Sequence, residues 1–487
     1  MTRDVTEDMT RGRAPGLVRG MARELAQLPA SHNCLIAGTT LITAAVVTAT
    51  IAFGAAGLGV VLGVLIGGGL LAWTAYRPIV ATYVYVGTLP IIAGIDRDTL
   101  IPLVRPNEAL LTLLLAGACL GGYLRYCRGD AVAVGLHRLE VPVAAFLLAS
   151  TVWPLTSLML RVNTPLSSDL AAVLPVCKLV AIYLLVRFTV STQDQLVRVL
   201  RLIVWPGSVV AVIAILQTLG FGPVLTLLTA VWSPTEAAGT IAARGGTTLS
   251  SPIATGDYII FCLVLVIFAA TRGVLDRRER LGLGFVLAAG VLASGQFSTW
   301  ISAAVAAGLI LWRFPELRHR VWRFLLILPI IFMIGAPAFF TRMGGFAGRG
   351  VPDSWQGRWD NLSNFYLPQF DWLGILIGVS PNPVLQASET WRDVIYLENG
   401  YLQFLWIGGV PLLLAFGWLS VVVLRRSKEL MGEPQALGAV AAALWTVWCF
   451  LLVLTVIDPH LTMRGIGDIL FVLLAIIMGR IGGDHHS

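Results

Sequence analysis

Long apolar runs recur along the whole chain, and they constrain its fold more than any other feature. A run of about 18 or more apolar residues is long enough to span about 30 Å of hydrocarbon as a helix. Only 13% of the residues are charged and 57% are hydrophobic, whereas about a quarter of the residues are charged in a soluble domain. The sequence therefore predicts an all-α, polytopic transmembrane helical bundle and excludes a soluble protein.

We expect about 12–14 spans, and the apolar runs mark where they lie. The runs lie near residues 34–53, 56–73, 78–94, 108–124, 141–160, 171–190, 199–219, 256–272, 281–295, 298–313, 322–340, 402–424, 436–457 and 466–482. They divide the chain into an N-terminal tail (1–33), transmembrane helices (34–340) with a loop at 220–255, a large loop (341–397), C-terminal transmembrane helices (398–482) and a second tail (483–487).

The basic residues predict which side each loop faces. With a cytoplasmic N-terminus, about 24 of the 34 lysines and arginines fall on the inner side, in agreement with the positive-inside rule. Both termini should then be cytoplasmic, and both long loops should lie outside the cytoplasmic (inner) membrane. The outer loops contain no cysteine, so we expect no structural disulfide. The net charge of +7 reflects this asymmetry and does not indicate a nucleic-acid partner.

The large loop, 341–397, is expected to be partly helical and functional. A loop of this length in a compact protein usually has a function, and its aromatic residues argue against a disordered tether. Its aromatic and charged residues include Trp355, Trp359, Trp372, Trp391, Arg358, Arg392, Asp353, Asp360 and Asp393. Aromatic rings can anchor the loop among lipid headgroups. They can also stack on sugar rings while the charged groups bind hydroxyls or phosphates.

Two cations outside this loop are further candidates. Lys178 lies within the span 171–190, where an ionisable side chain is costly, so it either faces a functional cavity or snorkels outward. Arg244 precedes two glycines and a Thr/Ser series, a segment that can offer a guanidinium and backbone N–H groups to an anion. The same composition is also typical of a plain loop.

The stretch "YLENGYLQFLWIGGV" (396–410) places Glu398 and Asn399 where the large loop meets an apolar helix. One interpretation is an ordinary helix start, because acidic and amide side chains are favoured there. The other is the edge of an active site, because a carboxylate at a half-buried junction can serve as a general base.

Four segments together resemble the O-antigen ligase and O-antigen polymerase family, which are polytopic glycosyltransferases that use a polyprenyl-diphosphate carrier. The segment "ENGYLQFLWIGGVPLLLAF" (398–416) is similar to the family's His-Asn-x-Tyr-Leu motif, with Glu398 in the place of the histidine. The other three segments are "GRWDNLSNFYLPQFDWLGILIGVSP" (357–381), "RGGTTLSSPIATGDYIIFCLVL" (244–265) and "LASGQFSTWISAAVAAGLIL" (292–311). The resemblance covers roughly residues 170–482 and implies a GT-C-like fold.

The resemblance implies transfer of a glycan from a polyprenyl-diphosphate donor to an acceptor hydroxyl on the outer face of the membrane. Glu398 would be the base, and Arg244 and Arg358 would stabilise the leaving diphosphate, because arginine binds phosphate bidentately. Substrate binding would involve Arg392, Asn399, Tyr401, Lys178, Trp359 and His460, which is the one histidine on the predicted outer side. No cluster of His and Cys has metal-ligand spacing, so we expect neither a metal nor another cofactor.

Three alternatives remain open at this stage. A flippase or transporter for lipid-linked glycans is disfavoured, because the spans show no evident repeat and almost no charge. A different polyprenyl-diphosphate glycosyltransferase would use Asp353, Asp360 or Asp393 as its key acid. A non-catalytic scaffold of an envelope-assembly complex would tolerate loss of Glu398 and the arginines. The sequence indicates neither the sugar nor whether the acceptor is a glycan, a lipid or a protein.

Overall fold

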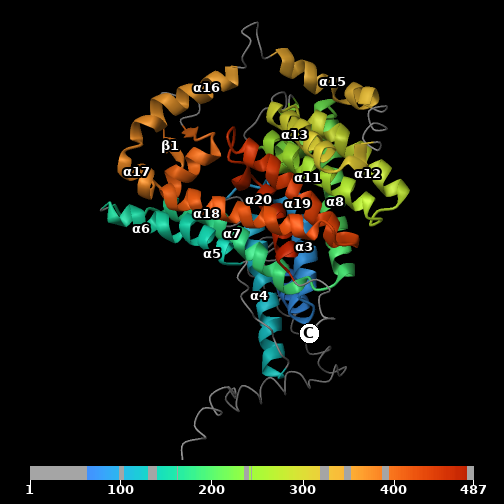
Figure 1. The fold of residues 1–487 in the computed structure, drawn as a ribbon, viewed down its shortest axis with the longest axis horizontal. Coiled ribbons are helices and arrows are strands. Elements are labelled where there is room, and N and C mark those ends of the chain that lie inside the picture. The colour runs from blue at the N-terminus through green and yellow to red at the C-terminus, as the bar shows by residue number, and fades with distance from the viewer. Residues whose placement is uncertain are drawn as a thin grey trace, which may run out of the picture. The chain divides into compact units, whose positions relative to one another are not determined.

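The computed structural model describes residues 63–97, 104–129, 140–161, 163–234, 241–242, 244–318, 328–344, 353–386 and 394–479 (Figure 1). Regular structure in these residues is almost entirely helical, which confirms the predicted all-α class. The chain divides into two compact units, one of residues 1–81 and 112–136 and the other of residues 82–111 and 137–487.

Close helix packing marks the described part of the first unit. The helix Gly63–Tyr76 lies beside α4 (Pro106–Cys127), with Gly117 and Gly121 of α4 at the contact. A Cβ atom on Gly121 would collide with the backbone of Ala75, and one on Gly117 would collide with Thr74. Small residues four positions apart let two helix backbones approach in this way.

The remaining elements belong mainly or wholly to the second unit. The helices are α3 (Ile79–Ile92), α5 (Val141–Ser150), α6 (Val152–Leu160), α7 (Ser167–Thr189), α8 (Gln193–Thr218), α9 (Gly222–Val231), α11 (Pro252–Thr271), α12 (Arg277–Ala293), α13 (Phe297–Arg313), α15 (Leu328–Gly344), α16 (Asp353–Asn361), α17 (Trp372–Ile377), α18 (Gly400–Leu430), α19 (Gln435–Leu454) and α20 (Ile466–Met478). Short 3-10 or π turns are η2 (Thr247–Leu249), η3 (Pro315–Leu317), η4 (Leu362–Tyr366), η5 (Leu367–Gln369) and η6 (His460–Thr462).

Seven helical segments in the described residues are long and apolar enough to cross a membrane, which indicates a multi-pass membrane protein. They are α4, the segment formed by α5 and α6, α7, α8, α11, α18 and α19. Shorter apolar helices include α3, α13 and α20. The predicted span 34–53 lies outside the described residues. The total of 12–14 spans, the side that each loop faces and the GT-C-like arrangement therefore stay predictions.

Helix α20 forms the centre of the second unit. Its sequence, IGDILFVLLAIIM, is apolar all round apart from Asp468, and every one of its residues is buried. A helix that is hydrophobic all round is expected to be surrounded by other helices, and α20 packs against α7 and α19. Helix α19 in turn packs against α11 and α18, so the last two helices of the chain support the elements that carry the candidate site.

Helix α18 is interrupted at the glycine pair of the "WIGGVP" segment. Gly409 has φ 63° and ψ −155°, a conformation that essentially only glycine adopts, and Pro411 has no N–H to continue the helical hydrogen bonds. The carbonyl of Trp406 instead accepts hydrogen bonds from the backbone N–H groups of Val379 (2.6 Å) and Ser380 (3.1 Å). The interruption thus provides an attachment point for the large loop.

The described part of the large loop forms a small folded layer on α18, visible above the first part of that helix in Figure 1. Besides the predicted helices it contains an antiparallel hairpin of β1 (Val384–Gln386) and β2 (Val394–Tyr396), which the sequence did not predict. The Tyr366 hydroxyl donates to Pro383 O (2.7 Å) and lies close to Ile395 O (3.0 Å). The Tyr366 ring meets Trp406 edge-on, with 5.1 Å between centroids, which fixes the layer to α18.

Candidate functional site

Arg358 of α16 brings together two carboxylates that are far apart in the sequence. Its Nε lies 2.6 Å from Glu398 Oε2. Its Nη2 and Nη1 lie 3.1 Å and 3.2 Å from Asp458 Oδ1 and Oδ2, which is a bidentate pairing. Such fork-to-fork pairs are among the strongest charge-assisted hydrogen bonds. The predicted proximity of Arg358 and Glu398 is therefore present, whereas the sequence did not identify Asp458.

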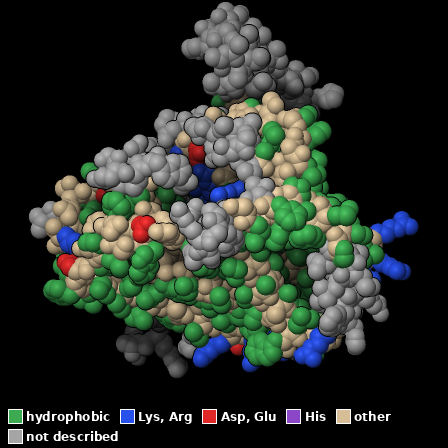
Figure 2. Space-filling model, turned by 90° about the horizontal axis from the view of Figure 1, so that it is seen from above, with side chains coloured by type: hydrophobic (Ala, Val, Ile, Leu, Met, Phe, Trp, Pro, Cys, Tyr) green, Lys and Arg blue, Asp and Glu red, His purple; other side chains and the backbone are tan. Residues whose placement is uncertain are grey.

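Arg358 and Glu398 line a pocket of about 310 Å³. Aromatic side chains contribute much of its wall, and they are Trp355, Trp359, Tyr366 and Tyr396. Trp359 is 65% exposed, so its ring is available to a ligand. Figure 2 shows basic and acidic side chains together in a hollow of the face seen from above. The pocket thus combines a guanidinium, a carboxylate and exposed indole rings.

The start of α18 is tied to the end of α19, and these bonds position Glu398. The Asn399 side chain caps α18 by accepting from Leu402 N (3.0 Å) and donates to Val456 O (2.8 Å). Gly400 N donates to Thr455 O (2.8 Å), and the Tyr401 hydroxyl donates to Leu452 O (2.7 Å). Asn399 and Tyr401 were predicted to orient substrate or to close the loop. Their polar groups hold the helix start in this structure, and Asn399 also lines the Arg358 pocket.

Asp458 is a buried carboxylate next to the pocket. It is 1% exposed, and burial raises its pKa to about 6, against the opposing effects of the positive charges of Arg358 and His460. A carboxyl group that titrates near 6 changes its charge within a range that cells encounter. The pairing with Arg358 therefore depends on pH.

His460 and Asp257 form a second, fully buried pair behind Asp458. His460 Nδ1 lies 2.5 Å from Asp257 Oδ2, and His460 N donates to Asp458 O (2.8 Å). Burial lowers the pKa of His460, but the charge and hydrogen bond of Asp257 outweigh burial, so the pKa is raised above its ordinary value. His460 Nε2 and Asp257 Oδ1 are buried without a hydrogen-bond partner among the described residues. His460, predicted to bind substrate, does not line the pocket.

Arg244 lies in a different, closely bonded segment. The Gln217 side chain donates to Ile241 O (2.7 Å) and Arg244 O (2.9 Å) and accepts from Thr247 N (3.0 Å). The Thr248 hydroxyl donates to Pro90 O (2.6 Å). Arg244 itself is exposed and is not among the residues that line the Arg358 pocket. The polar groups of this segment therefore hold helices together, and Arg244, predicted to act on the leaving diphosphate with Arg358, does not share the Arg358 pocket.

Lys178 does not snorkel outward. Its Nζ lies 2.9 Å from Asp468 Oδ1 and 3.0 Å from Oδ2, and the Tyr85 hydroxyl donates to Asp468 Oδ1 (2.7 Å). All three side chains are buried or nearly so. Of the two readings offered by the sequence, outward snorkelling is wrong, because a buried carboxylate on α20 compensates the ammonium charge within the bundle.

Several other predicted residues lie elsewhere or outside the described residues. Arg392 and the rival acid Asp393 fall outside them, and the side chain of Asp353 is likewise not described. Asp360 is exposed and does not line the pocket. In the part of the chain that the structure covers, no group of three or more His, Cys, Asp or Glu side chains could hold a metal ion.

Asp257, Asp458 and Asp468 are the functional candidates that sequence reasoning missed. Each is a carboxylate at the end of a long apolar run, 1% exposed in the structure. That position was a usable signal, since a carboxylate within or beside a span requires a partner. The partners themselves lie on distant elements and were not predictable from spacing.

No protein-family model matches the sequence, and neither a curated protein nor a solved structure matches it.

Proposed function

We propose that this protein is a membrane glycosyltransferase, a ligase or polymerase that transfers a glycan from a polyprenyl-diphosphate carrier to an acceptor hydroxyl. The observation that carries the proposal is the Arg358–Glu398 pair, 2.6 Å apart, in a pocket with exposed tryptophans. A guanidinium beside a carboxylate supplies the two groups that this reaction requires. The resemblance of residues 398–416 to the ligase motif supports the same assignment, as does the apolar bundle, which suits a lipid-linked donor.

In the proposed reaction, the acceptor oxygen forms a bond to the anomeric carbon while the bond from that carbon to the diphosphate oxygen breaks. The diphosphate leaves with the electron pair, and Arg358 stabilises the charge that develops on it. The proton of the acceptor hydroxyl passes to Glu398, which acts as the general base. Trp355 and Trp359 stack on sugar rings.

The proposed setting is the outer face of the cytoplasmic membrane, in the assembly of envelope polysaccharide or glycoconjugate. The partners are a polyprenyl-diphosphate-linked glycan and an acceptor that is a glycan, a lipid or a protein. The arginine distribution supports this side of the membrane, because it predicts that the large loop is extracytoplasmic.

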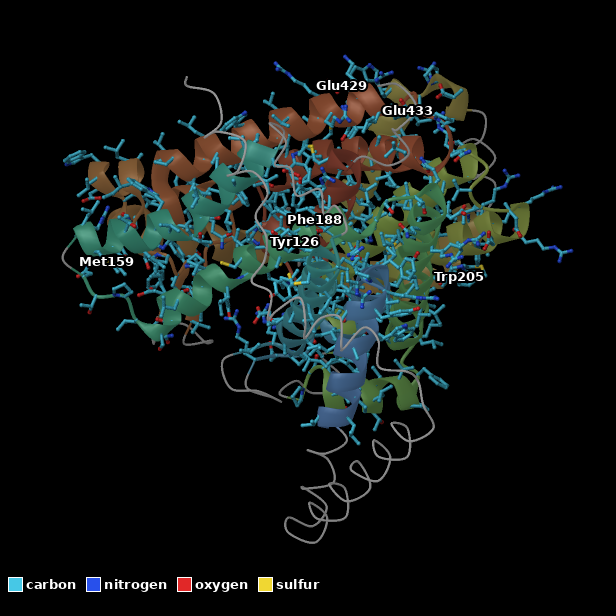
Figure 3. All side chains as sticks on the ribbon, turned by 90° about the horizontal axis from the view of Figure 1, so that it is seen from below. Tyr126, Met159, Phe188, Trp205, Glu429 and Glu433 are labelled. Atoms are coloured by element: carbon cyan, nitrogen blue, oxygen red, sulfur yellow. The ribbon has the colours of Figure 1, made fainter. Side chains whose placement is uncertain are left out.

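A transfer assay with purified protein in nanodiscs tests the proposal. Donor prepared from the same cells is mixed with acceptor, and glycan transfer is followed for wild type, Glu398→Gln and Arg358→Ala. We expect a loss of about 100-fold or more in both variants. Glu429→Gln is the control, because Glu429 lies on the last turn of α18 and pairs only with Arg426 among the residues described (Figure 3). Full transfer by both site variants would refute this assignment.

A flippase for lipid-linked glycans is the second candidate, and the buried charges favour it. Lys178–Asp468 and His460–Asp257 place ionisable groups inside the bundle, whereas the sequence indicated almost no charge within the spans. Intramembrane ionisable groups often serve transport. Movement of labelled donor between leaflets of proteoliposomes, without glycan transfer, would establish this function in place of the first.

A further inference from the structure

The hydrogen-bond donors of Arg358 are divided between two carboxylates of different exposure. Nε faces Glu398, whereas Nη1 and Nη2 face Asp458. The Glu398 side chain is 32% exposed and the Asp458 side chain is 1% exposed. Because the Nε–H of Arg358 donates to Glu398, an anion that binds this edge of the guanidinium must displace that carboxylate.

The pocket shows which carboxylate an incoming anion meets. Glu398 lines the pocket together with Arg358, whereas Asp458 does not line it. Glu398, whose side chain is already 32% exposed, can turn further into the open pocket and be hydrated by solvent there. Asp458 has no such route, because it is buried and loss of its partner would leave an uncompensated charge.

We propose that Asp458 is a positioning residue that holds Arg358 throughout the reaction, and that Glu398 occupies the donor's phosphate subsite until the donor displaces it. This inference rests on the proposed glycosyl transfer and assigns the Nε edge of Arg358 as the subsite for one phosphoryl oxygen. The ligand class is a diphosphate ester.

The exchange couples donor binding to release of the base. While Glu398 pairs with Arg358, one of its carboxylate oxygens lies 2.6 Å from Nε and is engaged by the guanidinium. When a phosphoryl oxygen takes its place at Nε, the released carboxylate is free to turn toward the acceptor hydroxyl. The base is then available only when a donor is bound, and the same guanidinium is already placed on the leaving group.

The surroundings of Asp458 suit a permanent anchor. His460 N donates to Asp458 O at 2.8 Å, and the ring of His460 is held by Asp257 at 2.5 Å. The preceding residues are tied to α18, since Thr455 O accepts from Gly400 N and Val456 O accepts from Asn399. The α18–α19 bonds fix the backbone at Glu398, whereas among the described residues its carboxylate has an ion pair only with Arg358.

Two measurements on the full-length protein in phosphate-free detergent test the inference. The first is the affinity for a short-chain isoprenyl diphosphate by titration calorimetry, and the second is glycan transfer. For Glu398→Gln we expect binding about fivefold tighter, the equivalent of a partly exposed ion pair, together with loss of transfer. For Asp458→Asn we expect weaker binding and a higher KM. Glu429→Gln should change neither quantity.

The outcomes separate this inference from the function on which it rests. Wild type could bind the probe and transfer glycan while Glu398→Gln binds no more tightly. In that case the proposed displacement of Glu398 by the donor is wrong, and the proposed glycosyltransferase function still stands. If wild type neither binds nor transfers, both fail. If Asp458→Asn does not fold, Asp458→Glu is measured in its place. A positioning role for Asp458 predicts that the carboxylate of this variant retains diphosphate binding. Weak binding by a folded Asp458→Glu variant would contradict that role.

Discussion

At the scale of single residues, Asp458 gives the site a pH dependence unlike that of an ordinary aspartate. Its pKa is about 6, so it takes up a proton as the pH falls through 6 and then no longer offers Arg358 two charged acceptors. We expect diphosphate binding to weaken below about pH 6, not near pH 4. Calorimetric titrations between pH 5 and 8 would measure this fall in affinity on the acid side. The Asp458→Asn variant should bind weakly at every pH; the same acid limb in that variant would contradict the assignment.

His460 makes the stability of the fold depend on pH, and the loss is on the alkaline side. Its folded pKa is raised above the ordinary value by Asp257, so its stabilising charge is fully present below about 6.5. That stabilisation is lost as the pH rises through the folded pKa. We expect the melting temperature of wild type to fall on this alkaline side and the fall to be smaller in His460→Gln. Equal slopes in the two proteins would show that the buried pair does not titrate in this way.

Substitution of Lys178 measures how much stability is lost when the buried carboxylate of Asp468 has no cation beside it. Lys178→Met leaves Asp468 without its cation, and we expect the variant to lose about 3–5 kcal/mol of stability. The double variant Lys178→Met/Asp468→Leu removes both charges and should recover most of the loss. Thermal unfolding in detergent checks the order of stabilities. A single variant as stable as wild type would mean that water reaches Asp468.

At the scale of elements, the interruption of α18 depends on one glycine. A Cβ atom on Gly409 would lie 2.5 Å from Leu376 O, and its φ of 63° strains any other residue. We expect Gly409→Ala to cost roughly 1–3 kcal/mol and to loosen the large loop from α18. The control is Gly417→Ala on the same helix, where a Cβ meets nothing within 4 Å, and this change should be neutral or slightly stabilising.

Limited proteolysis measures whether the large loop in Gly409→Ala has loosened from α18, independently of the free energy of unfolding. We expect faster cleavage near residues 353–386 in Gly409→Ala than in Gly417→Ala, because Val379 and Ser380 lose their shared acceptor, the Trp406 carbonyl. Identical cleavage rates would mean that the aromatic contacts of Tyr366 with Trp406 hold the loop without these backbone bonds.

At the scale of the whole molecule, the arginine distribution predicts opposite sides for the two ends of α18. Gln356 on α16 is exposed near the start of α18, and Glu433, labelled in Figure 3, is exposed beyond its end. In a cysteine-free background, we expect Gln356→Cys to react with a membrane-impermeant maleimide in intact cells. Glu433→Cys should react only after permeabilisation. Reaction of both from one side would overturn the predicted topology.

The sequence predicted the elements better than it predicted their contacts. Apolar runs such as 436–457 correspond closely to helices such as α19, because a long hydrophobic segment in a membrane has few other structures available. The hairpin of β1 and β2 was not predicted, since three-residue strands carry too little periodicity. Arg358 and Glu398 were recognised from their residue types and position. Asp458 and Asp257 were not, because their partners come from elements about 100 and 200 residues away in the chain.

The close approach of Gly378 to α18 has a consequence for finding relatives of this chain. A Cβ on Gly378 would lie 2.6 Å from Ile407 O, just as one on Gly409 would lie 2.5 Å from Leu376 O. Two backbones touch here with no side chain between them, so neither position can change alone without moving a main chain. An exposed ionisable side chain is under no such main-chain constraint. A pattern search anchored on these two glycines is therefore better suited to distant relatives than one anchored on the ionisable residues.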